Sequence, residues 1–171
     1  GVPVLEVADI VRRSELVILA ATGDALTALV RQFETDSFGQ AGQIVAHLSP
    51  GHGVDVLAPC AARGLIPLRL FPMLPMTGTS LDVGRLKNAW CAVSAPGPVM
   101  PIAQALAIEI GMEPFIVKSG QEEAFAEVVD SLTSSSMSFV KTAVETIEGA
   151  GLDNVATALS ALATAAVEAA L

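Results

Sequence analysis

The chain has 171 residues, which is enough for one medium-sized globular domain or for a domain with a smaller appendage. Apolar residues make up 52% of it and charged residues only 16%, so the chain can bury a large core and is not disordered. Its net charge of −9, without a sizeable cluster of Lys or Arg, argues against a nucleic-acid surface.

The cysteines and the apolar segments indicate a cytoplasmic protein without a membrane span. Cys60 and Cys91 form no C-x-x-C pair, which favours two buried, reduced thiols. No charged segment followed by an apolar core marks a signal peptide. The Ala-rich range 155–171 is the one stretch that could be taken for a membrane span, but its Thr, Ser and Glu residues favour burial in a core or in an oligomer interface.

Short apolar runs alternate with helical patterns along the first 118 residues. Helical spacing of apolar residues predicts helices over the ranges 5–14, 25–33, 54–63, 83–87 and 98–110. Continuous apolar runs predict strands over the ranges 16–21, 43–48, 67–71, 90–94 and 114–117. This alternation is typical of an α/β fold with a mostly parallel sheet and helices on both faces.

Local signals predict how some of these helices begin. Thr22 or Asp24 is a plausible N-cap for the helix at 25–33, and Asp82 is placed to cap the helix at 83–87. Pro59 is compatible with the helix at 54–63 only if it lies in the first turn.

The pattern changes after Lys118. Two long helices are predicted over the ranges 122–148 and 152–171, joined at Gly149–Gly151, and no strand is predicted within them. The fold class is therefore α/β, a partial Rossmann-like, mostly parallel sheet followed by an all-α helical tail.

This change of pattern divides the chain into two predicted domains, an α/β domain at residues 1–118 and a helical C-terminal domain at residues 119–171. The tail helices carry few charges, which implies burial against a partner such as a second copy of the chain. We therefore predict a two-fold homodimer in which residues 139–171 form much of the interface.

The range 71–82 is a loop rich in Pro, Gly and Thr that follows a predicted buried strand. In open α/β sheets, ligands bind at loops that leave the carboxyl ends of strands. Gly78 permits backbone conformations that other residues resist, and Thr77 and Thr79 place hydroxyls on the loop. The alternative is an ordinary connection between a strand and a helix.

His47 and Ser49 lie at the end of another predicted strand. His47 could act as an acid or base, or donate a hydrogen bond to a substrate, but it could equally be a structural donor to the backbone. Ser49 could bind a carboxylate or simply form a turn. No G-x-S-x-G motif is present, which argues against a hydrolase. The spacing of His47, His52 and Asp55 fits no standard zinc pattern, so no metal site is predicted.

No G-x-G-x-x-G turn occurs in the sequence. Its order of strands and helices resembles the second half of a dinucleotide-binding sheet. Its landmarks follow one order: Asp9 to Ala21 with Asp24; Ile44 to Ser49; Leu57-Ala58-Pro59 with Gly64; Pro72; Thr77-Gly78-Thr79 through Asp82 and Leu86; Gly111; and Gly149 to Gly151. In these landmarks the chain resembles the Rossmann-like oxidoreductase-type proteins with a C-terminal helical domain of unknown function, which are similar in layout to pyrroline-carboxylate and ketopantoate reductases. Members of that family normally carry a Gly-rich βαβ unit ahead of the position of Gly1, so we expect either a fragment or a chain that has lost this unit.

The resemblance implies an NAD(P)-dependent oxidoreductase that acts on a small keto acid or imine. Its cofactor, NADP or NAD, would lie over the loops Ala21–Asp24 and His47–Pro50, with Ala21, Thr22, Gly23 and Asp24 as the cofactor-binding residues. The resemblance further implies His47 and Ser49 as catalytic residues and a small-molecule substrate near Thr77 and Thr79.

Several polar positions of that family are replaced in this chain. The family's His-Thr-Ser-Gly loop matches His47-Leu48-Ser49-Pro50, and its His-Pro pair matches Phe71-Pro72. Its Arg, Tyr-His and Asn on the helical domain fall at Glu122, Phe125-Ala126 and Ser134. Because the apolar replacements can neither move protons nor hydrogen-bond a substrate, the alternative is a non-catalytic binding or assembly module.

Overall fold

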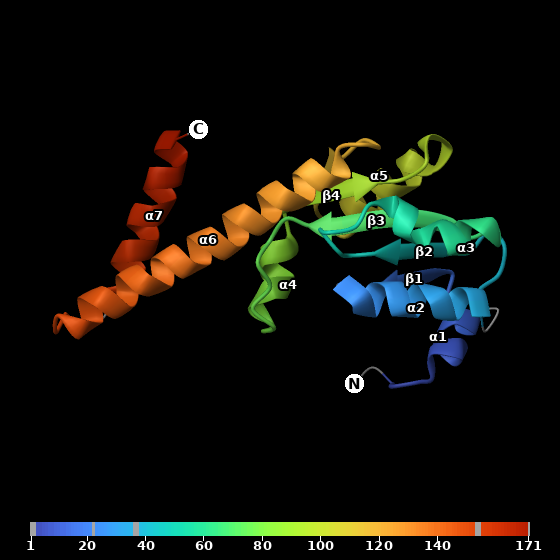
Figure 1. The fold of residues 1–171 in the computed structure, drawn as a ribbon, viewed down its shortest axis with the longest axis horizontal. Helices are drawn as coiled ribbons and strands as arrows, with labels where there is room; N and C mark the ends of the chain where they lie inside the picture. Colours follow the sequence, from blue (N-terminus) through green and yellow to red (C-terminus); the bar gives the residue numbers. More distant parts are fainter. Residues whose placement is uncertain (1–2, 22, 36–37, 153–154, 171) are drawn as a thin grey trace. The chain divides into compact units, whose positions relative to one another are not determined.

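The computed structural model describes residues 3–21, 23–35, 38–152 and 155–170 (Figure 1). The chain forms two compact units, Gly1–Ala126 and Glu127–Leu171. The first unit contains the sheet, and every regular element among the described residues of the second unit is a helix.

The sheet of the first unit has five strands in the order β1-β2-β3-β4-β5. Their bounds are β1 Leu16–Leu19, β2 Ile44–His47, β3 Ile66–Pro72, β4 Trp90–Ser94 and β5 Glu113–Ile116. β1, β2 and β3 are parallel, β4 is antiparallel to β3, and β5 is parallel to β4. The mostly parallel sheet predicted from the sequence is thus confirmed, and the carboxyl ends of its first three strands share one edge.

Five α-helices and two 3-10 helices lie before or between the described strands. They are α1 Val7–Arg13, α2 Gly23–Thr35, η1 Val54–Leu57, α3 Ala58–Ala62, α4 Leu81–Leu86, η2 Gly97–Val99 and α5 Met100–Glu109. The single helix predicted at 54–63 is split into η1 and α3, and Pro59 lies in the first turn of α3, where its missing N–H is not needed. Likewise, the predicted helix at 98–110 is divided into η2 and α5, and each of them has a proline in its first turn.

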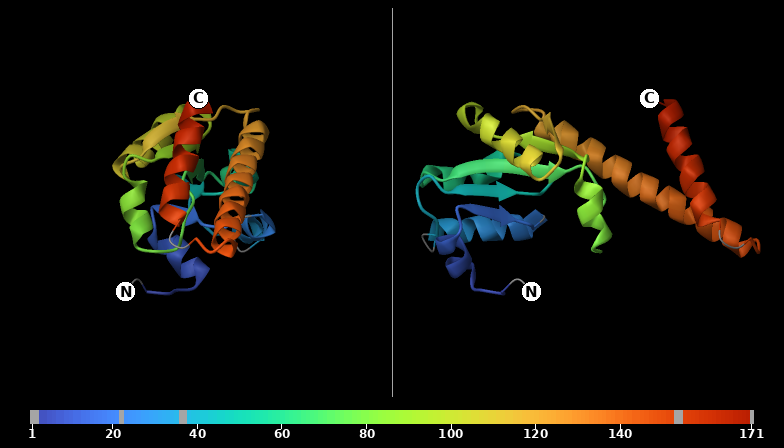
Figure 2. Two further views of the ribbon diagram at one scale, coloured as in Figure 1. Left: turned by 90° about the vertical axis from the view of Figure 1, so that its left-hand side faces the viewer. Right: turned by 180° about the vertical axis from the view of Figure 1, so that it is seen from behind.

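Two apolar clusters cover opposite faces of the sheet because neighbouring side chains of a strand alternate between faces. Val45 lies in the cluster that includes Leu26 and Phe33 of α2, and Ala46 lies in the cluster that includes Ala103 and Ala107 of α5. α2 and α5 accordingly lie on opposite faces of the sheet (Figure 1 and Figure 2). One cysteine belongs to each cluster, and burial raises the pKa of both thiols to about 11. Both thiols are therefore protonated at neutral pH.

The helical tail consists of α6, Glu122–Gly149, which starts in the first unit, and α7, Ala156–Ala170. The described residues from 122 onward contain no strand, so the predicted all-α tail is confirmed. Neither helix has a buried residue among those described. Large apolar side chains are exposed to solvent, among them Leu132 (65% of its surface), Phe139 (74%) and Leu162 (66%). None of the described helices is both long and apolar enough to cross a membrane.

Both N-cap predictions that fall on described residues are wrong. Asp24 lies inside α2, which begins at Gly23, so it cannot be the N-cap. α4 begins at Leu81 with Ser80 as its N-cap, which places Asp82 in the first turn. The alternative cap of α2, Thr22, lies outside the described residues.

Candidate functional site

His47 is the last residue of β2, and its side chain is fully buried. Its Nδ1 accepts the backbone N–H of Ser49 at 3.2 Å. The ring proton therefore sits on Nε2, which donates to the carbonyl oxygen of Gly53 at 3.1 Å. Burial lowers the pKa of His47 to about 4, and the nearby charge of Arg69 contributes. His47 is thus a neutral imidazole, with both nitrogens engaged by the loop that follows its own strand.

Ser49 is buried within the same loop. Its Oγ lies 3.0 Å from Nδ1 of His52, and its backbone N–H is the donor to His47. The two residues predicted to be catalytic, His47 and Ser49, are therefore brought together, but each makes hydrogen bonds inside the loop. In this arrangement they fix the shape of the loop at the carboxyl end of β2.

Arg69 is a residue of this cluster that the sequence analysis did not single out. It pairs with His47 in the register of β2 and β3, so both side chains lie on the same face of the sheet. Its side chain is fully buried, and Nη1 donates to the carbonyl oxygen of His52 at 3.4 Å. Among the residues that the structure describes, its Nε and Nη2 have no hydrogen-bond partner. A lone arginine inside the apolar run from Ile66 to Leu70 was the available signal.

Three phenylalanines close the cluster on the side of α6. The ring of Phe125 lies 4.9 Å from the Arg69 guanidinium carbon, within the range of a cation–π contact. Phe125 also stacks on Phe115, with ring centroids 6.3 Å apart, and meets Phe71 edge-on at 6.2 Å. The first turns of α6, which belong to the first unit, thereby hold the guanidinium plane in place.

The loop before α4 is ordered by Asp82. The Asp82 carboxylate accepts the backbone N–H groups of Thr77 and Gly78, both at 2.8 Å, and the Thr77 hydroxyl at 2.9 Å. Burial alone would raise the pKa of Asp82, but these hydrogen bonds and one from Arg85 outweigh it and lower that pKa. Asp82 therefore folds back onto the loop instead of capping α4, because its oxygens already bind these donors.

The hydroxyls of Thr77 and Thr79 lie 2.9 Å apart on the exposed surface of this loop. Gly78 between them has φ +76°, a conformation that side-chain-bearing residues rarely adopt. Asp82 thus fixes the backbone of a turn that presents two adjacent hydroxyls to solvent. The described contacts of the turn do not extend to His47 or Ser49.

We expect Asp82→Ala to loosen this turn, because the N–H groups of Thr77 and Gly78 and the Thr77 hydroxyl would lose their shared acceptor. Limited proteolysis should then cut the range 73–80 several-fold faster than in the wild type. Asp82→Asn retains one oxygen acceptor and should give an intermediate rate. Equal cleavage of all three proteins would show that Asp82 does not hold the turn.

The predicted cofactor loop follows β1, beside the His47 loop. Ala21 is half-buried against the apolar cluster that includes Leu26 and Phe33. Gly23 is the first residue of α2 and has φ +55°, and Asp24 is exposed in the first turn of that helix. Nothing lies within 4 Å of a side-chain carbon placed on Gly23, so the start of α2 is open. Thr22 lies outside the described residues. Because β1 and β2 are neighbouring parallel strands, both loops leave the same edge of the sheet.

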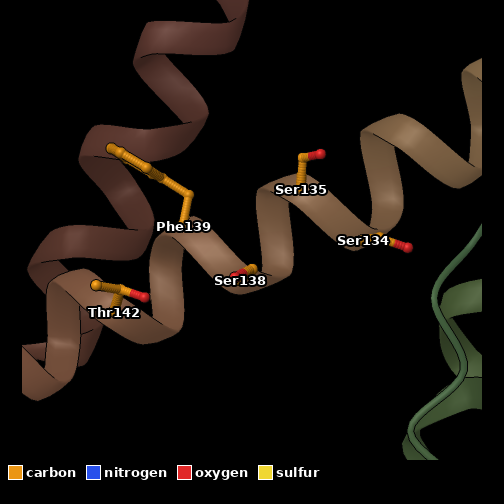
Figure 3. A pocket seen from close by; sticks show the side chains of 5 residues that line it. All are labelled: Ser134, Ser135, Ser138, Phe139 and Thr142. Carbon is orange, nitrogen blue, oxygen red and sulfur yellow. The ribbon is translucent and has the colours of Figure 1, made fainter.

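Two other kinds of site concern metal-ligating side chains and a surface depression in the second unit. No group of three or more His, Cys, Asp or Glu residues in the described part of the chain is placed to hold a metal ion. In the second unit a depression is lined by Ser134, Ser135, Ser138, Phe139 and Thr142, and Figure 3 shows that all five side chains come from α6. This depression carries no charged group.

The fold of the chain is similar to that of known proteins. Residues 1–72 match the family model of the Rossmann-like domain. No curated protein sequence matches the chain. A reductive aminase from Aspergillus terreus, solved with NADPH and ethyl levulinate, has a TM-score of 0.66 and 16% identity, over 95% of this chain and 55% of that one.

Two further solved structures have the same layout. For an imine reductase from Bacillus cereus, the TM-score is 0.60 at 16% identity, over 96% of this chain and 57% of that one. For a pyrroline-5-carboxylate reductase from Coxiella burnetii, the TM-score is 0.55 at 16% identity, over 91% and 55%. The chain therefore spans little more than half the length of these proteins. Its class is a Rossmann-like α/β fold with C-terminal helices, which confirms the fold that the resemblance implied.

Proposed function

We propose that the chain is part of an NAD(P)-dependent oxidoreductase that reduces a small keto acid or imine. The observation that carries this proposal is the fold shared with reductases of which one was solved with NADPH and another, an imine reductase from Myxococcus stipitatus, with NAD+. The bound nicotinamide would supply the hydride. The chain's own residues would bind and orient both molecules at the edge where the loops after β1 and β2 meet.

The residues at this edge suit such a role. The open start of α2 at Gly23 leaves room for a cofactor beside the backbone of Ala21 to Asp24. His47 and Ser49 would shape the adjoining loop and exclude water from its buried side, and the substrate would lie near the hydroxyl oxygens of Thr77 and Thr79, which can accept a hydrogen bond from it. Because His47 is neutral, it would hold this loop through its own hydrogen bonds rather than act as a cation.

The organisation of the protein belongs to the same proposal. Residues 1–118 would form the second part of the dinucleotide-binding domain, and residues 119–171 a helical domain that joins two copies in a homodimer. The solvent-exposed apolar side chains of α6 and α7 support this assembly, because a second copy of the chain would cover them. The two unpaired, buried thiols suit a cytoplasmic location.

A non-catalytic binding or assembly module is the second candidate. It is favoured by one specific observation: both nitrogens of His47 are engaged within its own loop, so the ring is not free to exchange a proton with a substrate. Phe71 and Phe125 likewise place apolar rings where the family resemblance puts polar groups. This candidate predicts a stable dimer with no turnover.

Titration of the full-length protein with NADPH and NADH, followed by nicotinamide fluorescence, tests the first candidate. Gly23→Leu should weaken binding about tenfold or more, because a side chain would fill the open space at the start of α2. Gly42→Leu is the matched control, since Gly42 also has a positive φ and open surroundings but precedes β2 at the opposite edge. If the wild type binds neither nucleotide, the oxidoreductase proposal is rejected. Turnover of a keto acid or imine would instead reject the non-catalytic module.

A further inference from the structure

The Arg69 guanidinium is the one charged side chain of the described chain that is fully buried. None of the ion pairs found among the described residues includes it. Burial lowers the pKa of the Arg69 guanidinium, and the carboxylate whose charge opposes this shift by raising that pKa is that of Glu122. However, the Oε2 of Glu122 accepts a hydrogen bond from the backbone N–H of Gly120 at 2.7 Å. A buried charge without an ion-pair partner destabilises a folded protein, so its presence here calls for an explanation.

The geometry of the free donors narrows the choice of ligand. The one hydrogen bond of the guanidinium uses Nη1, whereas Nε and Nη2 are unpartnered. These two nitrogens share one edge of the planar guanidinium, and their N–H groups point in parallel. That edge matches the two oxygens of a carboxylate in a bidentate pair. The Phe125 ring, with its centroid 4.9 Å from the guanidinium carbon, packs against the same group.

We propose that Arg69 binds the carboxylate of the substrate through Nε and Nη2, so that the substrate is a keto acid or another carboxylate-bearing compound rather than an uncharged ketone or imine. The inference rests on the proposed oxidoreductase function for the role of this ligand. The ligand reaches the guanidinium when the loop from Ser49 to Gly53 moves aside. This movement breaks the 3.4 Å hydrogen bond from Arg69 to His52 and the 3.1 Å hydrogen bond from His47 to Gly53.

The electrostatics of the cluster support an anionic ligand. The ring of His47, which shares a sheet face with Arg69, is neutral because burial keeps its pKa at about 4. Arg69 is therefore the permanent positive charge beside this loop, since an arginine side chain remains protonated in proteins. Hydrogen bonds from a charged donor to a charged acceptor are also stronger than those between neutral groups.

Calorimetric titration of the full-length protein with levulinate and with ethyl levulinate tests this inference. The two compounds share a ketone, but the ester lacks the carboxylate. We expect levulinate to bind about tenfold or more tightly than its ester. Arg69→Met should remove that preference, and Arg69→Lys should weaken it, because an ammonium group retains the charge but loses the planar fork. Equal affinity for the two compounds, or no binding of either, would overturn the inference.

Thermal unfolding of the ligand-free variants gives a second readout. Arg69→Met should leave the midpoint unchanged or raise it, because it removes an unpaired buried charge. Arg63→Met is the matched control: Arg63 is half-buried and donates from Nη1 to the carbonyl oxygens of Phe33 and Phe38, so its loss should lower the midpoint. If Arg69→Met lowers the midpoint as much as Arg63→Met, Arg69 is a structural residue and the inference fails.

The outcomes separate this inference from the proposed function. Tight levulinate binding without nicotinamide binding would keep the carboxylate site and reject the oxidoreductase. Reduction of the ester as fast as the acid would keep the oxidoreductase and reject the site. Binding of inorganic phosphate in place of levulinate, lost in Arg69→Met, would overturn the assignment of a carboxylate and assign the guanidinium to a phosphate group.

Discussion

A Leu162→Asp variant is expected to elute as a monomer, or to aggregate, whereas the wild type is expected to elute as a dimer. Leu162 lies on α7, and 66% of its surface is exposed in the single chain. It shares one helix face with Leu159 and Ala166, because these positions recur at intervals of three and four. If this face is covered by a second copy, the substitution buries an unpaired carboxylate at a cost of several kcal/mol. Chromatography with light scattering at micromolar concentration measures the difference.

Ser160→Asp is the matched control for this experiment. It adds the same charge to the same helix, but position 160 lies on the opposite face from Leu162 and is exposed. The control should remain dimeric. A wild type that is already monomeric would reject the homodimer, as would two variants that dissociate equally. A dimer that survives Leu162→Asp would move the interface away from this face of α7.

The strands and helices could be predicted because each type of element has a characteristic spacing of apolar residues in the local sequence. The apolar runs identified all five strands, and the change of period after Lys118 identified the tail. What the runs cannot show is direction: nothing in the residues of β4 says that it is antiparallel to β3. That direction is set by the path of the chain through the turn at Thr77 and through α4, which depends on contacts made only in the folded protein.

The site was harder to predict because one residue type can serve two roles. An Asp before a short helix is typical of an N-cap, yet Asp82 binds the preceding turn, since the N–H groups of Thr77 and Gly78 converge on it. His47 and Ser49 were identified by their position at a strand end, but their mutual hydrogen bond depends on how the loop folds. Arg69 was overlooked because an apolar run was interpreted as strand core. Only the register of β2 and β3 places it beside His47.

The stability of the protein is expected to fall between pH 6.5 and pH 4 because of His47. In the unfolded chain this histidine has an ordinary pKa of about 6.5. In the folded protein burial lowers its pKa to about 4, and the positive charges of Arg69 and His52 act in the same direction, against a hydrogen bond to Gly53 and the charge of Asp55. Above pH 6.5 the ring is neutral in both states, so no stability is lost there.

As the pH falls below 6.5, the unfolded chain takes up a proton that the folded protein does not accept, so protonation favours unfolding. The loss continues until the pH approaches the folded pKa of about 4 and reaches at most about 3 kcal/mol. Asp82, whose pKa is lowered from 3.8, loses its own contribution only below this window. Urea unfolding at pH 7, 6, 5 and 4 should therefore show a slope against pH that is absent in His47→Gln. Packing lost in that variant shifts its stability equally at every pH, so equal slopes in the two proteins would mean that His47 titrates normally and is not held neutral by its burial.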